Sequence, residues 1–343
     1  MFPVGTRLHG RFRVTGHLGS GGMGEVLSAE DSKLGREVAL KVLTADGARD
    51  PELLARFERE ARAAQKIGHP GIVRVYEVSK GEGGLLPYLV MERLRGVTLD
   101  EVVDRGRLPI DRALTISIEM LDALAAAHAA GIVHRDVKPQ NVHVAEDLAP
   151  GSVKLLDFGV AKLADDARLT ASGAVLGTPL YMPPEQLRGE VVDPAADVYA
   201  AGAVLYELLT GAPIFDAPPS HLWVHVLKTE PVPVAELRPD VPPAVAEVVG
   251  RALRKARAER YADAADMTAA LEAAATGVAV TRPARRSSRA PRRRRRSWWV
   301  VAAIVAGLLV AAIAAGAAIA VATGRRSHAV TPKTLGTEAR PGL

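Results

Sequence analysis

The pattern of apolar residues changes once along this chain, near residue 95, and that change restricts the possible folds more than any other feature. Before it, short apolar or alternating runs such as EVALKVL, VRVYEV and PYLVME predict strands, with one helix that begins at Asp50 and Pro51. After it, long apolar segments such as RALTISIEMLDALAAAHAAG and ADVYAAGAVLYELLTG predict helices. A strand-rich lobe followed by a helix-rich lobe indicates an α+β protein.

The composition narrows the class of protein. The chain has 343 residues, enough for two domains or for one two-lobed enzyme. It has no cysteine, which excludes disulfides, a thiol nucleophile and cysteine-ligated zinc. The formal net charge is +5, but residues 282–296 hold nine Arg and no acidic residue, so the rest of the chain carries −4. The globular part therefore has no general attraction to nucleic acid.

The last segments differ in composition from the rest. Residues 279–297 are rich in Arg, Pro and Ser and predict a linker, because such a segment cannot bury a core. Residues 298–323 carry no charge and, at about 1.5 Å per residue, are long enough to cross a hydrocarbon core of about 30 Å as a transmembrane helix. Since the Arg-rich side should face the cytoplasm, we expect residues 1–278 on the cytoplasmic side of the cell membrane. Residues 324–343 would form a short tail on the other side, without room for a folded sensor. The alternative for residues 298–323 is a buried alanine-rich helix.

A glycine-rich stretch, GSGGMGEV, lies between two predicted strands. Glycines at positions 19, 21 and 24 allow backbone amides to approach phosphate oxygens without an intervening Cβ. A strand rather than a helix follows, so the stretch does not fit the dinucleotide-binding fingerprint. Alone, it is also consistent with a simple turn between strands.

Two charged residues occur in apolar surroundings. Lys41 lies within VALKVL, and a buried ammonium needs an anionic partner. Glu60, beside the apolar face of the helix that follows, is the candidate partner. Each alone has an ordinary explanation, as a strand lysine that reaches solvent or as a surface residue of a helix.

The loop HRDVKPQN, residues 134–141, places Asp136, Lys138 and Asn141 in fixed order before an apolar strand. Further on, Asp157 ends the apolar run KLLD and a glycine follows two residues later. Carboxylate and amide oxygens suit a hard cation, so Asn141 and Asp157 are candidate ligands of magnesium. Alone, each motif also fits a polar loop or a turn.

Taken in order, these motifs resemble the eukaryotic-type (Hanks-type) Ser/Thr protein kinases of bacteria, over about residues 8–275. The order is glycine loop, strand Lys, helix Glu, HRDVKPQN, DFG, GTPLYMPPE and an apolar helix that opens with Asp197. The resemblance implies a bilobal protein kinase fold, with a small β-rich N-lobe over about residues 1–92 and a larger helical C-lobe over about residues 97–278. It also implies ATP-dependent phosphorylation of protein Ser and Thr hydroxyls in bacterial membrane-associated signalling.

The resemblance assigns catalytic or metal-binding roles to six residues. Asp136 would orient the substrate hydroxyl, and Lys138 would steady the transferring phosphoryl group. Lys41, paired with Glu60, would contact the α- and β-phosphates of ATP. Asn141 and Asp157 would bind Mg²⁺ or Mn²⁺. The implied nucleotide pocket consists of Leu18, Gly19, Gly21, Gly24, Val26, Ala39, Lys41, Met91, Glu92 and Leu94, with Met91 as gatekeeper and residues 92–94 as the hinge.

The resemblance also marks a regulatory segment between Asp157 and Glu185. Thr170 and Ser172 would be phosphorylated by another copy of the chain, and Arg135 would bind the added phosphate. Thr178 matches the position that supports recognition of the substrate hydroxyl.

Several expectations follow about partners and alternatives. Glu185 would pair with Arg260, a structural contact. The expected partners are protein substrates, a second copy of the chain and anionic lipids at the Arg-rich linker; nucleic acid is not expected. The alternatives are a pseudokinase that binds nucleotide or partners without phosphoryl transfer, and a membrane-tethered nucleic-acid binder that depends on the Arg block alone.

Overall fold

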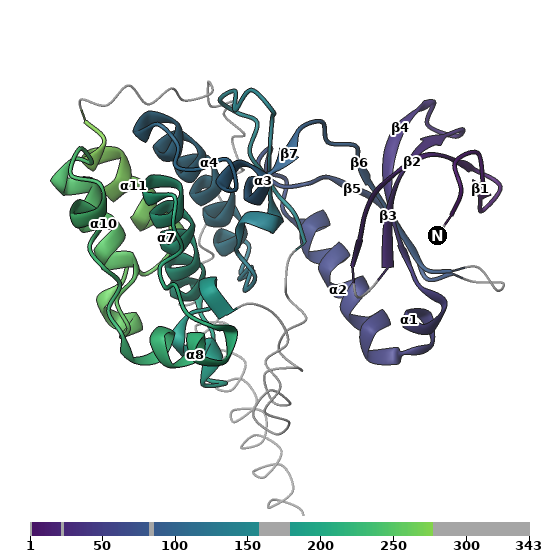
Figure 1. Ribbon diagram of the computed structural model, residues 1–343. Coiled ribbons are helices and arrows are strands. Elements are labelled where there is room, and N and C mark those ends of the chain that lie inside the picture. Colours follow the sequence, from purple (N-terminus) through teal and green to yellow (C-terminus); the bar gives the residue numbers. More distant parts are fainter. Residues whose placement is uncertain (1, 22–23, 82–85, 158–178, 277–343) are drawn as a thin grey trace, which may run out of the picture. The chain divides into compact units, whose positions relative to one another are not determined.

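The structure is a computed structural model that describes residues 2–21, 24–81, 86–157 and 179–276. The described chain forms two lobes, one built mainly of strands and one mainly of helices (Figure 1). The predicted α+β bilobal fold is therefore confirmed.

The N-terminal lobe contains a six-stranded antiparallel sheet in the order β1-β2-β3-β4-β6-β5. Its strands are β1 (Arg7–Leu8), β2 (Phe12–Gly21), β3 (Gly24–Asp31), β4 (Arg36–Leu43), β5 (Val75–Ser79) and β6 (Tyr88–Glu92). Alternate residues of β4 divide between two faces. Val38, Leu40 and Val42 pack in the lobe's own core, so Ala39 and Lys41 lie on the opposite face.

Helix α2 (Pro51–Lys66) follows the short helix α1 (Ala45–Arg49) and lies beside the sheet (Figure 1). The Asp50 carboxylate caps it by accepting the N–H groups of Glu52 and Leu53 at 2.9 and 3.2 Å. Phe57 and Ala61 are buried on its apolar face. The predicted start and the predicted buried face of this helix are both confirmed.

The C-terminal lobe is built around a helix that is buried along almost its whole length, α7 (Pro194–Thr210). A helix that is apolar on all sides belongs inside a core. The helices α4 (Ile110–Ala129), α10 (Pro243–Ala252) and α11 (Ala264–Ala274) pack against it. The other helices that the structure describes in this lobe are α3 (Leu99–Val103), α6 (Pro184–Leu187), α8 (Pro219–Lys228) and α9 (Val234–Leu237), with the 3₁₀ helices η2 (Pro139–Asn141), η4 (Pro179–Tyr181) and η5 (Arg257–Glu259).

A small sheet, β7 (Val97–Thr98), β8 (Val142–Val144) and β9 (Lys154–Leu155), belongs to the C-terminal lobe and reaches the other lobe. The Val73 N–H donates to the Leu155 carbonyl at 3.0 Å, and the Leu155 N–H donates to the Gly71 carbonyl at 2.8 Å. Ile72 thereby pairs with Leu155 as a parallel bridge. Gly71 also packs closely on α4, since a Cβ there would lie 3.0 Å from the Cβ of Ala123.

The predicted transmembrane helix, residues 298–323, lies outside the described residues, as do the linker and the tail around it. Among the helices that the structure does describe, none combines the length and the apolar character that crossing a membrane requires.

Candidate functional site

The loop of residues 134–141 lies between α4 and β8, and one buried carboxylate, that of Asp197, holds its first residues by hydrogen bonds. Asp197, in the first turn of α7, accepts the N–H of His134 at 2.7 Å and that of Arg135 at 2.8 Å. Arg135 has a φ of 67°, a left-handed conformation that a non-glycine residue rarely adopts. His134 is fully buried and its Nε2 contacts the Leu156 carbonyl at 3.0 Å. The carboxylate thus holds the loop in an unusual backbone conformation.

Three predicted catalytic or metal-binding residues meet within this loop. The Lys138 Nζ lies 2.9 Å from Asp136 Oδ2. The Asn141 amide nitrogen donates to the Asp136 carbonyl at 2.8 Å and to Asp136 Oδ2 at 3.0 Å. Because the nitrogen of Asn141 faces Asp136, its amide oxygen is left for another ligand.

An ion pair between Lys41 of the strand-rich lobe and Asp157 connects the two lobes. The Lys41 Nζ lies 2.8 Å from Asp157 Oδ1, and the two side chains are 12% and 50% exposed. The structure does not describe the side chain of Glu60, so the predicted contact between Lys41 and Glu60 stays a prediction. The contact between Lys41 and Asp157 was not predicted from the sequence.

The two candidate metal ligands are linked through the backbone. The Leu156 N–H donates to the Asn141 carbonyl at 2.9 Å, which ties the segment that carries Asp157 to the end of the loop. One carboxylate and one amide oxygen are hard donors, and a Mg²⁺ ion held by one or two carboxylates normally completes its shell with water and substrate phosphates. The residues present therefore fit such an ion.

The predicted nucleotide pocket is assembled by strand register. Val26 pairs with Lys41 across β3 and β4, and Ala39 pairs with Met91 across β4 and β6. Gly24 must be glycine, because a Cβ there would lie 2.0 Å from the Val42 carbonyl oxygen. Gly19 and Gly21 face Val26 and Gly24 across the β2–β3 pair, and Leu18 is 39% exposed. A cavity of 20 Å³ adjoins this region and is lined by Lys41, Phe57, Ala61, Ala64, Val73, Val75, Leu89, Met91 and Asp157.

A polar pair in the helical lobe, Tyr181 and Glu207, was not singled out from the sequence. The Tyr181 hydroxyl donates to Glu207 Oε2 at 2.5 Å. Burial raises the pKa of the Glu207 carboxyl. Burial, and to a smaller extent the negative charge of Glu207, raises the pKa of Tyr181. Asp197 was noted only as the start of an apolar helix, although one acidic residue in the first turn of such a helix was the available signal.

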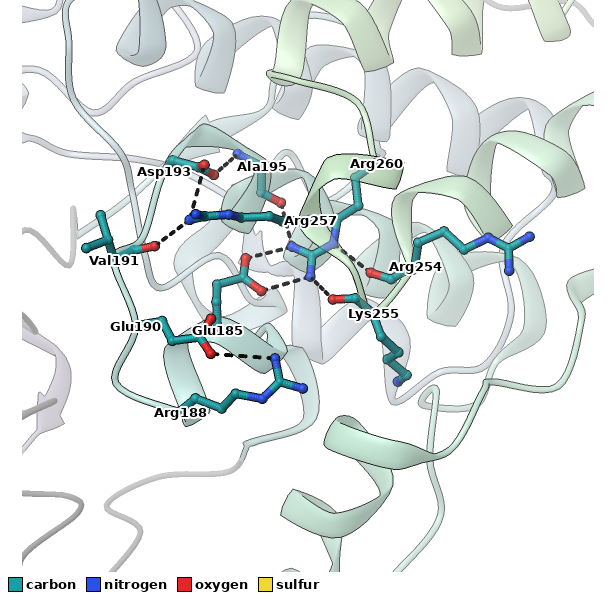
Figure 2. A network of polar contacts seen from close by, with 10 residues as sticks. All are labelled: Glu185, Arg188, Glu190, Val191, Asp193, Ala195, Arg254, Lys255, Arg257 and Arg260. Atoms are coloured by element: carbon teal, nitrogen blue, oxygen red, sulfur yellow. Dashed lines mark hydrogen bonds and ion pairs between the residues drawn. The ribbon is translucent and has the colours of Figure 1, made fainter.

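The predicted pair of Glu185 and Arg260 is confirmed. Figure 2 shows the guanidinium of Arg260 facing the carboxylate of Glu185, with contacts of 2.7 and 2.8 Å. Thr170, Ser172 and Thr178 lie outside the described residues, so their roles stay predictions.

Comparison with known proteins supplies independent information. A family profile described as "Protein kinase domain" matches residues 12–270. The serine/threonine-protein kinase PknB of Mycolicibacterium smegmatis is 46% identical over 271 residues, which cover 77% of this chain and 43% of that protein. A probable serine/threonine-protein kinase of Streptomyces coelicolor is 43% identical over 279 residues, which cover 79% of this chain and 41% of that protein.

Solved structures agree with these sequence relatives. The crystal structure of the PknI kinase domain of Mycobacterium tuberculosis is similar with a TM-score of 0.64 and 29% identity, covering 80% of this chain and 100% of that domain. The chain spans less than half the length of the curated relatives named above.

Proposed function

The chain belongs to the protein kinase family, and from this premise we propose that it transfers the γ-phosphate of ATP to Ser or Thr hydroxyls of proteins. The observation that carries the proposal is that Asp136, Lys138 and Asn141 meet in one loop. This loop is hydrogen-bonded to the segment that carries Asp157, and the Asp157 carboxylate contacts Lys41. A scaffold that only binds nucleotide would not require this whole set of charged groups.

Each side chain has a role that its position supports. Asp136 accepts or orients the proton of the attacking hydroxyl, and Lys138, at 2.9 Å from it, neutralises charge on the transferring phosphoryl group. Lys41 binds the α- and β-phosphates. Catalysis then consists mainly of positioning and electrostatic stabilisation.

Asn141 and Asp157 would hold the divalent metal ion. When bound, Mg²⁺ or Mn²⁺ neutralises the phosphate oxygens and orients them. The hydrogen bond from Leu156 to Asn141 keeps the two candidate ligands in adjacent segments. On the other side, the pocket of Leu18, Val26, Ala39 and Met91 binds adenine, and the backbone of residues 92–94 pairs with its edge.

Activation by phosphorylation of Thr170 or Ser172 in trans is also part of the proposal. One guanidinium nitrogen of Arg135, Nη1, is buried and has no hydrogen-bond partner among the described residues. A buried cationic donor without a partner is costly, and a phosphate adds about −1.5 to −2 charges and three acceptors. Phosphorylation would therefore supply a partner for Nη1 of Arg135.

We further propose that the chain is anchored in the cell membrane. This part rests on the uncharged residues 298–323 and the nine Arg residues that precede them. The Arg-rich segment would also attract anionic lipid, at about 1 kcal/mol per Arg near the surface. Anchoring would place the kinase domain in the cytoplasm and concentrate its copies for trans-phosphorylation.

Phosphoryl transfer from radiolabelled ATP to a protein substrate, with Mg²⁺ or Mn²⁺ present, tests the activity. We expect Asp136→Asn and Lys41→Met to lower the rate by about 100-fold or more. Asp147→Asn is a matched control, because Asp147 is exposed and, among the described residues, its carboxylate accepts just the N–H of Ala149 at 3.0 Å. Wild-type rates in the first two variants would refute the proposed roles.

A further inference from the structure

The carboxylate of Glu92 joins three segments of the chain at the start of the hinge. Its Oε1 accepts the backbone N–H of Arg74 at 2.7 Å and contacts the Nζ of Lys154, also at 2.7 Å. The N–H of Glu92 in turn donates to the Arg74 carbonyl at 2.9 Å. One carboxylate oxygen thus connects the end of β6, the residue before β5, and β9.

Lys154 reaches Glu92 because of the register of the small sheet. Val142 on β8 lies opposite Leu155 on β9, and both are fully buried in the core of the helical lobe. Since successive residues of a strand point to opposite faces, Lys154 lies on the face turned away from that core. Its ammonium therefore extends to Glu92 in the other lobe, 62 positions away in the sequence.

The contact between Lys154 and Glu92 is partly shielded from water. Their side chains are only 21% and 23% exposed. Another ion pair beside the hinge, Arg95 with Glu37, spans 3.5 Å with side chains 88% and 59% exposed. A shielded pair is screened less by salt, and removing one member leaves the other charge poorly solvated. Loss of Lys154 therefore disturbs Glu92 more than loss of Arg95 disturbs Glu37.

The strand that carries Lys154 also leads to the proposed metal-binding residues. Leu155 is hydrogen-bonded to Gly71 and Val73, and Asp157 follows two residues later. The contact between Lys154 and Glu92 is thus a side-chain link between the hinge and the segment that places Asp157.

We propose that Lys154 is a positioning residue for nucleotide binding, which holds Glu92 and so fixes the hinge relative to the segment that carries Asp157. This inference rests on the proposed function. When the link is lost, the hinge binds the base less tightly and releases the product more readily. Nucleotide affinity therefore changes more than the rate of transfer at saturating ATP.

Four forms of the full chain test this: wild type, Lys154→Met, Lys154→Arg and Arg95→Met. We measure the Kd for ADP by equilibrium titration, together with KM for ATP and kcat. For Lys154→Met we expect Kd and KM to rise about fivefold, with kcat changed less than about twofold. Lys154→Arg keeps the charge and should restore affinity, and Arg95→Met should match wild type.

Wild-type affinity in Lys154→Met, or equal losses in Lys154→Met and Arg95→Met, overturns this inference alone. A wild-type protein that neither binds ADP nor transfers phosphate refutes the proposed function, and this inference with it. If Lys154→Met unfolds under the assay conditions, Glu92→Gln takes its place, because glutamine keeps an acceptor for the Arg74 N–H but loses the charge. Glu92→Gln should show the same rise in Kd, and an unchanged Kd would overturn the inference.

Discussion

The imidazole of His128 and the carboxylate of Asp197 lie 2.8 Å apart inside the helical lobe, with side chains only 4% and 1% exposed. The N–H of Ala264, at the start of α11, donates to His128 Nδ1 at 3.3 Å. We therefore assign the imidazole proton to Nε2, which donates to Asp197. The same carboxylate accepts the N–H groups of His134 and Arg135, so His128 supports the carboxylate that holds the proposed catalytic loop.

We predict that His128→Leu lowers both stability and the rate of phosphoryl transfer. The substitution leaves a buried carboxylate with one donor fewer, at a cost of about 1–3 kcal/mol. Urea unfolding gives the free energy of unfolding, and a kinase assay at a temperature where the variant is folded gives kcat. His17→Leu is the control, since the His17 side chain is 34% exposed and its distance of 3.9 Å from the Glu25 carboxylate is long for an ion pair. Equal effects of the two substitutions would contradict the assigned role.

We predict a large loss of stability for Arg260→Met and a small one for Arg257→Met. Arg260 and Glu185 form a bidentate pair whose side chains are 0% and 3% exposed, and breaking such a buried pair costs about 3–5 kcal/mol. Arg257 lies in the same network (Figure 2), 3.6 Å from Asp193 with side chains 48% and 44% exposed. An exposed pair contributes about 0–1 kcal/mol. Urea unfolding of both variants measures the difference, and similar losses would refute the prediction.

We predict that Lys255→Met stabilises the protein at pH 7. The Lys255 Nζ is buried against the rings of Phe215 and Tyr199, 4.8 and 5.8 Å from their centroids, and has no hydrogen-bond partner in the described part of the chain. Burial lowers its pKa to about 8. Below pH 8 the folded protein bears the full cost of the buried ammonium, so replacing it is favourable.

The pH dependence gives a second check on Lys255. In the unfolded chain the lysine pKa is about 10.4, so the unfolded state binds more protons between pH 8 and about 10.4. The wild-type free energy of unfolding should therefore rise through this range relative to that of Lys255→Met. Urea unfolding at pH 7 and pH 10 measures this, and a constant difference between the two proteins would disprove it.

We predict that Gly96→Ala prevents stable folding. Gly96 has a φ of 132°, and a Cβ there would lie 2.1 Å from the backbone oxygen of Val144. A left-handed backbone and a clash with main-chain atoms are both unfavourable for alanine. Gly250→Ala is the control: apart from the backbone of its own helix α10 and its chain neighbours, no described atom lies within 4 Å of its Cβ position, so it should stabilise by up to about 1 kcal/mol. Circular dichroism melting of both variants distinguishes these outcomes.

Local patterns predicted the fold well, and long-range pairings poorly. The alternation in β4 and the capped start of α2 follow from neighbouring residues, so the sequence predicts both. The close packing of Asp136, Lys138 and Asn141 also follows from a short loop.

Contacts between distant segments are different. The sequence shows that Lys41 needs an anionic partner, but the position of Asp157 at 2.8 Å depends on how the two lobes meet. The contact between Glu92 and Lys154 likewise depends on the register of β8 and β9. No periodicity within one segment carries this information.

The parallel bridge between Ile72 and Leu155 has a consequence for the integrity of the molecule. Arg93 and Arg95 in the connection between the lobes are exposed, so trypsin can reach the peptide bonds after them. The hydrogen bonds of Gly71 and Val73 with Leu155 cross between the two pieces such a cut would leave, as does the packing of Gly71 on Ala123. A nicked chain would therefore remain a complex of two complementary fragments, and neither fragment would be an independent domain.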